Sequence, residues 1–157
     1  MSTYSSNGLS QGSVGESFPA ALLPASEGVR PAPKRVLLVD DRPVLLELLR
    51  CSCEGEDFEI RTTNNGKRAF EMFIGEHFDV VVTELAIPGI NGTHLAKLVK
   101  AHRPGTQVIL LTGFCKETTA SLTEIEDVDE VIYKPFQPSK LKSTIRSTLK
   151  STLNTPC

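Results

Sequence analysis

Charged and hydroxyl side chains stand at the ends of four of the five short apolar runs in this sequence. Asp40 and Asp41 follow the first run, and Glu84 closes the third. Thr112 closes the fourth run, and Lys134 follows the fifth. Carboxylates, a hydroxyl and a lysine are together the groups that hold a divalent cation and a phosphoryl group. Each residue is commonplace alone, but their order and their shared position predict a phosphoryl-binding site.

Three carboxylates brought to one place repel one another and require a cation. Oxygen ligands suit magnesium, and because magnesium keeps several waters, two carboxylates and one backbone carbonyl are a sufficient protein share. Lys134 would supply a further positive charge, Thr112 a hydroxyl donor, and Gly113 room for close approach. The chemistry predicted from these residue types is magnesium-assisted binding of a phosphoryl group.

The apolar runs alternate with segments in which apolar residues recur at helical spacing. The expected strands are at 36–39, 58–62, 80–82, 108–111 and 131–133. The expected helices are at 43–54, about 69–73, 95–99, about 116–123 and 139–150. This alternation implies βαβ units, and therefore a doubly wound α/β domain with a five-stranded parallel sheet. Ligands bind such sheets beyond the carboxyl ends of the strands, where the residues of the predicted site would meet.

The first expected helix, at 43–54, has three leucines at spacings that place them on one face. They are Leu45, Leu48 and Leu49. Pro43 suits the first turn of this helix, because the N–H that proline lacks would have no partner there. The segment is therefore predicted to cover one face of the sheet.

Residues 1–33 differ in composition from the rest of the chain. Ser, Gly and Pro occupy 15 of these 33 positions, and the one apolar cluster is at 20–23. Such a segment cannot bury enough apolar surface to offset the entropy lost on ordering, so we predict a flexible tail. Docking of this tail on a partner through Leu22 and Leu23 is the alternative. The expected folded domain is 34–150, followed by a short C-terminal tail at 151–157.

The overall composition excludes several classes of protein. A formal net charge of −2 argues against a general nucleic-acid binder. The sequence has no apolar run long enough to span a bilayer and no secretory signal pattern, so no membrane association is expected. The four cysteines (Cys51, Cys53, Cys115 and Cys157) lack the spacing of a zinc site. We expect reduced thiols and a cytoplasmic location.

Four segments of the sequence resemble the receiver domain of response regulators in two-component signalling. They are VLLVDD at 36–41, DVVVTELAIPGING at 79–92, VILLTG at 108–113 and KPF at 134–136. The resemblance extends from about 34 to 150. It implies the flavodoxin-like receiver fold, with a parallel sheet in the strand order 2-1-3-4-5.

The resemblance also implies a role for each residue of the predicted site. In this family Asp41 would bind Mg²⁺ directly and Asp40 through water, with the Ala86 carbonyl completing the protein ligands. Thr112 would hydrogen-bond the phosphoryl group, and Lys134 would pair with it. A histidine kinase supplies that group to an aspartate. Phosphorylation then alters the face formed by the fourth helix, the fifth strand and the fifth helix. That face is also the expected surface for a homodimer.

Glu84 stands where the family carries its phosphoacceptor aspartate, and it would also be a metal ligand. Its side chain is one methylene longer, and a misplacement of about 1 Å can lower a rate roughly a hundredfold. We therefore predict that phosphorylation is lost or impaired. The longer side chain would bring its carboxylate close to where phosphoryl oxygens sit, where it could pair with Lys134 and imitate the phosphorylated state. The alternative is that Glu84 is inert.

A second departure concerns the aromatic residue that often stands three positions before the lysine. That position is Val131 here, and the aromatic residue is Tyr133. The leading hypothesis is a stand-alone receiver module in phosphorelay signalling, not an enzyme, which binds a histidine kinase or another signalling protein. The alternatives are a small magnesium-dependent phosphohydrolase or phosphotransferase, and a structural scaffold without metal.

Overall fold

The structure, a computed structural model, describes residues 28–113 and 126–154. Within those ranges strands and helices alternate as expected, except between the last two strands, where residues 114–125 lie outside the described ranges. The elements are β1 (Lys34–Val39), α1 (Pro43–Cys53), β2 (Phe58–Thr63), α2 (Gly66–Gly75), β3 (Val80–Glu84), α3 (Gly92–His102), β4 (Gln107–Thr112), β5 (Glu130–Tyr133) and α4 (Pro138–Leu153). The helix expected at about 116–123 lies outside the described residues, so the label α4 belongs to the last helix of the chain.

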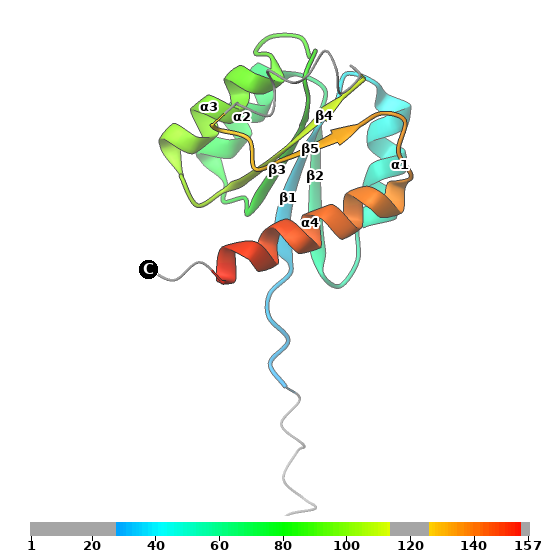
Figure 1. The fold of residues 1–157 in the computed structure, drawn as a ribbon, viewed down its shortest axis with the longest axis vertical. Helices are drawn as coiled ribbons and strands as arrows, with labels where there is room; N and C mark the ends of the chain where they lie inside the picture. The colour runs from blue at the N-terminus through cyan, green and yellow to red at the C-terminus, as the bar shows by residue number, and fades with distance from the viewer. Residues whose placement is uncertain (1–27, 114–125, 155–157) are drawn as a thin grey trace, which may run out of the picture. The chain divides into compact units, whose positions relative to one another are not determined.

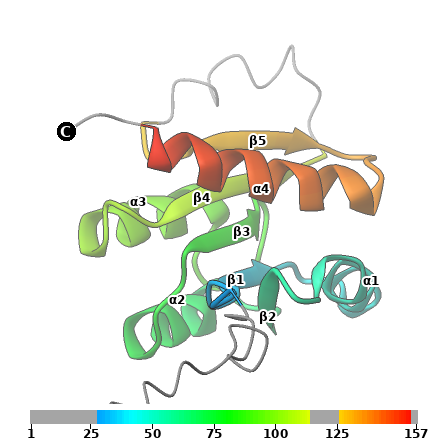
Figure 2. The same ribbon diagram turned by 90° about the horizontal axis from the view of Figure 1, so that it is seen from below.

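The five strands form one parallel sheet in the order β2-β1-β3-β4-β5, which confirms the predicted fold. β3 is the central strand, with β1 on one side and β4 on the other. Helices α1 and α4 cover one face of the sheet, and α2 and α3 cover the other (Figures 1 and 2). Because all strands run in the same direction, their carboxyl ends lie along one edge of the sheet.

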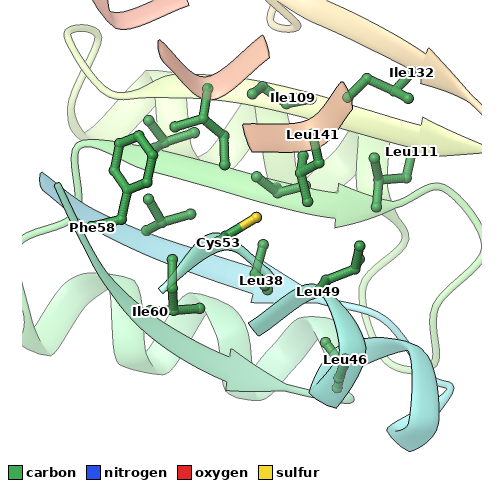
Figure 3. Close-up of a cluster of buried hydrophobic side chains, with 14 residues drawn as sticks. Leu38, Leu46, Leu49, Cys53, Phe58, Ile60, Ile109, Leu111, Ile132 and Leu141 are labelled. Atoms are coloured by element: carbon green, nitrogen blue, oxygen red, sulfur yellow. The ribbon is translucent and has the colours of Figure 1, made fainter. Parts of the chain in front are cut away.

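Apolar side chains are buried on both faces of the sheet, because successive residues of a strand point to opposite faces. On one face Leu38 packs with Leu49 of α1 and Leu141 of α4 (Figure 3). On the other face Leu37 belongs to a second buried cluster, together with Phe73 of α2. This double burial explains why the strand sequences are continuous apolar runs rather than alternating ones.

The packed face of α1 includes two of the three leucines that share a face, Leu45 and Leu49, but not Leu48. Leu46, Leu49 and Cys53 are the buried residues of this helix, whereas Leu48 is 51% exposed. Leu45 is half-buried at the margin of the cluster. The spacing of the leucines permits either face, and the helix turns the one that includes Cys53 towards the sheet and α4.

Short polar residues and prolines define where the helices begin. Asn65 caps α2 and Asn91 caps α3, each accepting a backbone N–H of the first turn with its side-chain oxygen. Pro43 and Pro138 occupy the first turns of α1 and α4, as proline at a helix start favours. Helix α4 continues to Leu153, beyond the predicted end at 150.

The termini and the cysteines are only partly within the described residues. Residues 1–27 and 155–157, and with them Leu22, Leu23 and Cys157, lie outside the described ranges, as does Cys115. Cys51 is an exposed free thiol and Cys53 a buried one. Across residues 28–113 and 126–154, no helix is both long and apolar enough to cross a membrane.

Candidate functional site

The carboxyl edge of the sheet brings together the residues that follow β1, β3, β4 and β5. Asp40 directly follows β1, Glu84 and Thr112 are the last residues of β3 and β4, and Lys134 directly follows β5. Asp40, Glu84 and Thr112 are all buried polar residues. The sheet order places these strands side by side, so residues up to 94 positions apart in the sequence meet at one edge.

Lys134 joins the two buried carboxylates of the site. Its Nζ lies 2.8 Å from Asp40 Oδ2 and also forms an ion pair with Glu84 Oε2. Its backbone N–H donates to the carbonyl oxygen of Thr112 at 2.8 Å, which fixes the start of the lysine segment beside the end of β4. The lysine is only 15% exposed, so its charge acts on both carboxylates with limited screening by water.

The second oxygen of the Glu84 carboxylate is bound by backbone amides. Glu84 Oε1 accepts from the N–H of Leu85 at 2.9 Å and from the N–H of Ala86 at 3.5 Å. The carboxylate therefore lies between an ammonium group and two amides. Donors of this kind are the ones that proteins use to bind phosphoryl oxygens.

The second oxygen of Asp40 is bound by Arg42, a residue that the sequence reasoning did not select. Asp40 Oδ1 accepts from the backbone N–H of Arg42 at 2.9 Å, and the Arg42 guanidinium lies 3.5 Å from the same oxygen. Arg42 directly follows the acidic pair in the sequence, and this proximity could have indicated that it pairs with one of the two carboxylates. Asp41, the other member of the pair, is exposed, whereas Asp40 is 1% exposed.

A glycine at the start of α3 packs against the backbone of Glu84 and Leu85. A Cβ on Gly92 would lie 2.4 Å from the carbonyl oxygen of Glu84 and 3.0 Å from the Cα of Leu85. The N–H of Gly92 donates to the carbonyl oxygen of Leu85 at 2.9 Å. The first turn of α3 therefore packs directly against the backbone that carries Glu84, and this close contact requires glycine.

The arrangement of the carboxylates does not fit a magnesium site as it stands. All four oxygens of Asp40 and Glu84 already contact N–H donors or cations of the chain. Among the described residues, no three His, Cys, Asp or Glu side chains lie together so as to hold a metal ion. Of the expected carboxylate ligands, Asp41 is exposed, whereas Asp40 and Glu84 are buried.

The aromatic residue near the site lies beside Thr112. Tyr133 is the register partner of Thr112, and Val131 is the partner of Leu110. Side chains alternate along a strand, so Tyr133 and Val131 share the face of β5 opposite Ile132, which is buried in the cluster with α1 and α4. The position three before the lysine is thus filled by a half-buried valine, and the aromatic side chain follows it by two residues.

Comparison with known families agrees with this fold. The family model of the response regulator receiver domain matches residues 36–146. The match covers more than half of the chain and includes every residue of the candidate site. The chain belongs to the receiver-domain family.

Curated proteins and solved structures also resemble this chain. The transcriptional regulatory protein SrrA of Staphylococcus aureus is 30% identical over 122 residues, which are 75% of this chain and 50% of SrrA. The chain thus spans about half the length of the curated relatives it matches. A CheY-like receiver domain from Methanospirillum hungatei superposes with a TM-score of 0.71 at 24% identity, covering 78% of this chain and 98% of that one. TrrA of Thermotoga maritima, solved in complex with Mg²⁺-BeF, gives a TM-score of 0.66 at 31% identity, covering 73% and 98%.

Proposed function

We propose that this receiver domain acts through protein–protein contacts and that its signalling site is set by Glu84 instead of by phosphorylation. The observation that carries the proposal is the position of the Glu84 carboxylate between Lys134 and the amides of Leu85 and Ala86. A lysine and backbone amides are the expected partners of a phosphoryl group at this edge. The glutamate satisfies them permanently with its own oxygens.

The same contacts argue against phosphorylation of Glu84. A carboxylate that attacks a phosphorus atom needs one oxygen in line with the leaving group, and in-line transfer depends strongly on placement. Both Glu84 oxygens are instead directed to donors of the chain. The side chain is also 12% exposed, so a phosphodonor would meet little of it. We therefore propose that phosphorylation is lost or severely impaired.

A protein partner is supported by an apolar cavity next to the site. Its volume is about 380 Å³. It is lined by residues of α1 and of the segment after β5, namely Arg42, Leu45, Leu48, Leu49, Lys134, Pro135, Phe136 and Pro138. Val44 on the same helix is 83% exposed. A histidine kinase or another signalling protein that docks here would contact Lys134 directly, and so would sense how Lys134 is held.

Other parts of the functional hypothesis stay predictions. They are the stand-alone character of the module, its cytoplasmic location, and a homodimer through the face that includes β5 and α4. The first is a prediction in particular because the chain matches half of SrrA. We propose a signalling role and no enzymatic turnover, since receiver domains are signalling modules.

Treatment with acetyl phosphate and Mg²⁺, followed by intact-mass measurement, tests the absence of phosphorylation. We expect no added phosphoryl group in the wild-type chain and labelling in Glu84→Asp, because the shorter side chain retracts from Lys134. A labelled wild type whose label disappears in Glu84→Ala would overturn the proposal. Glu71→Asp, an exposed glutamate on α2, is the matched control and should stay unlabelled.

Imitation of the phosphorylated state is tested by comparing backbone NMR shifts. Beryllium fluoride with Mg²⁺ is a phosphoryl analogue that can be added to Glu84→Asp. If Glu84 imitates the phosphorylated state, the wild-type shifts in β5 and α4 should match those of the treated variant. Wild-type shifts that match the untreated variant would mean that Glu84 is inert.

A further inference from the structure

We infer that Lys134 and Arg42 together take the place of a divalent cation in this site, so that the wild-type chain does not bind Mg²⁺ there. The inference rests on the proposed function, in which Glu84 forms a lasting ion pair with Lys134. It adds Arg42, and it concerns the metal rather than the phosphoryl group. It follows from the disagreement between the expected magnesium ligands and the contacts that their oxygens make.

The two buried carboxylates of the site face two cations of the chain, one buried and one exposed. Asp40 and Glu84 carry two negative charges, with side chains 1% and 12% exposed. Lys134 contributes one positive charge between them and is 15% exposed. Arg42 contributes the other, 3.5 Å from Asp40, although its side chain is 58% exposed and therefore more strongly screened. The repulsion that would attract a divalent cation is already offset by the chain.

The carboxylate oxygens are also occupied individually. Asp40 Oδ2 and Glu84 Oε2 share the ammonium of Lys134. Asp40 Oδ1 accepts from the Arg42 N–H, and Glu84 Oε1 accepts from the Leu85 N–H. Mg²⁺ demands a near-octahedral set of oxygens at short distance and loses its waters reluctantly. To enter, it would have to displace the ammonium from both carboxylates, and the ammonium would repel it at close range.

Asp41, the third carboxylate of the predicted site, is not one of these buried groups. It is exposed, and water screens its charge. A single exposed carboxylate is a weak ligand for an ion that keeps most of its hydration shell. The length of the Glu84 side chain matters as well, because it allows one oxygen to reach Lys134 while the other stays on the amides of its own loop. The contacts that Glu84 makes with Lys134 and the amides should therefore be independent of the Mg²⁺ concentration.

Titration of the full 157-residue chain with Mn²⁺, a paramagnetic substitute for Mg²⁺, tests the inference. Bound Mn²⁺ broadens nearby amide signals, so saturable broadening of Leu85 and Ala86 would report occupancy. We expect none in the wild type at millimolar Mn²⁺. The double variant Arg42→Ala/Lys134→Met removes both cations and should bind Mn²⁺ at least about tenfold more tightly. Arg68→Ala, in an exposed pair with Glu71, is the matched control and should behave as wild type.

Saturable broadening in the wild type would overturn the inference. So would a folded double variant that gains no affinity, because its carboxylates would then be unneutralised and yet still avoid the metal. If the double variant does not fold, the wild type still decides the question. Its Lys134 ammonium signals should be present without metal and unchanged by added Mg²⁺, and their displacement would refute the assignment. The Mn²⁺ titration contains no phosphodonor, so it is independent of the acetyl phosphate test. A wild type that binds Mn²⁺ but is not labelled by acetyl phosphate would contradict this inference and leave the proposed function intact.

Discussion

At the scale of single residues, Glu84 differs from an aspartate by the reach of its carboxylate. One methylene is enough for Oε2 to contact Lys134 while Oε1 stays on the amides of Leu85 and Ala86. Lys134 then bridges to Asp40, the most buried carboxylate of the site. The buried charges of the site therefore pair with one another, and removing one of them leaves another buried and poorly paired.

The first prediction concerns Glu84→Gln, which keeps the shape of the side chain and removes its charge. We expect the free energy of unfolding to fall by about 2–3 kcal/mol, because Lys134 loses a buried partner. Urea denaturation followed by circular dichroism measures this change. Glu71→Gln, which breaks an exposed pair with Arg68, is the control and should change stability by less than about 1 kcal/mol. Equal stabilities of the two variants would mean that the Glu84–Lys134 pair is not an energetic contact.

At the scale of elements, α3 makes specific contacts at both of its ends. Gly92 lets the first turn of α3 pack onto the backbone of Glu84. Arg103, just after α3, donates to the carbonyl oxygens of Phe73 and Glu76 at 2.6 and 2.8 Å, and its guanidinium lies 4.7 Å from the Phe73 ring centroid. The first contact fixes α3 against the end of β3, and the second joins the segment after α3 to the end of α2.

A second prediction compares two glycine-to-alanine changes. Gly92→Ala should destabilise the chain by about 2 kcal/mol or more, because its Cβ would lie 2.4 Å from a backbone oxygen that cannot easily move. It should also shift the NMR signals of Leu85. Gly75→Ala, at the end of α2, meets nothing within 4 Å and should be neutral or stabilising by up to about 1 kcal/mol. A neutral Gly92→Ala would mean that α3 moves freely relative to β3.

A third prediction concerns the Arg103 contacts with the end of α2. Arg103→Ala leaves helix-terminal carbonyls without these donors and should lower stability by about 1–3 kcal/mol. Amide exchange should accelerate in the last turn of α2 before it does elsewhere. Arg68→Ala removes an exposed arginine from the same helix and should leave exchange in that turn unchanged. Uniform acceleration across the chain would contradict a local capping role.

At the scale of the whole molecule, one sheet separates two buried clusters. Leu38 belongs to the cluster with α1 and α4, and Leu37 to the cluster with α2 and α3. Because adjacent residues of β1 serve both clusters, the two faces cannot separate without breaking the same strand. We therefore expect the domain to unfold as one cooperative unit.

The fourth prediction tests this cooperativity with Leu37→Ala and Leu38→Ala. Each should lower the free energy of unfolding by about 2–5 kcal/mol, as for other buried leucines. Labelling of Cys53 reports on the face with α1, where burial raises the pKa of the thiol and makes it unreactive in the native state. Both variants should accelerate labelling to the extent that they lower the unfolding free energy. Labelling that responds only to Leu38→Ala would show that the faces unfold separately.

The sequence by itself determined the elements and the place of the site. Continuous apolar runs such as 36–39 form strands buried on two faces, and alternation with helices requires a parallel sheet. In such a sheet the residues after the strands must gather at one edge. Asp40, Glu84, Thr112 and Lys134 could therefore be predicted as neighbours without any knowledge of their contacts.

Only the tertiary structure decided which charges meet. The buried face of α1 includes Leu46 rather than Leu48, because the rotation of a helix about its axis is set by packing against the sheet and α4. Asp41 is exposed although it adjoins the buried Asp40. The pairing of Asp40 with Lys134, 94 positions away, depends on side-chain reach across several strands. Local sequence patterns do not encode such distances, and this is why the sequence predicts which residues gather at this edge but not which of their atoms make contact.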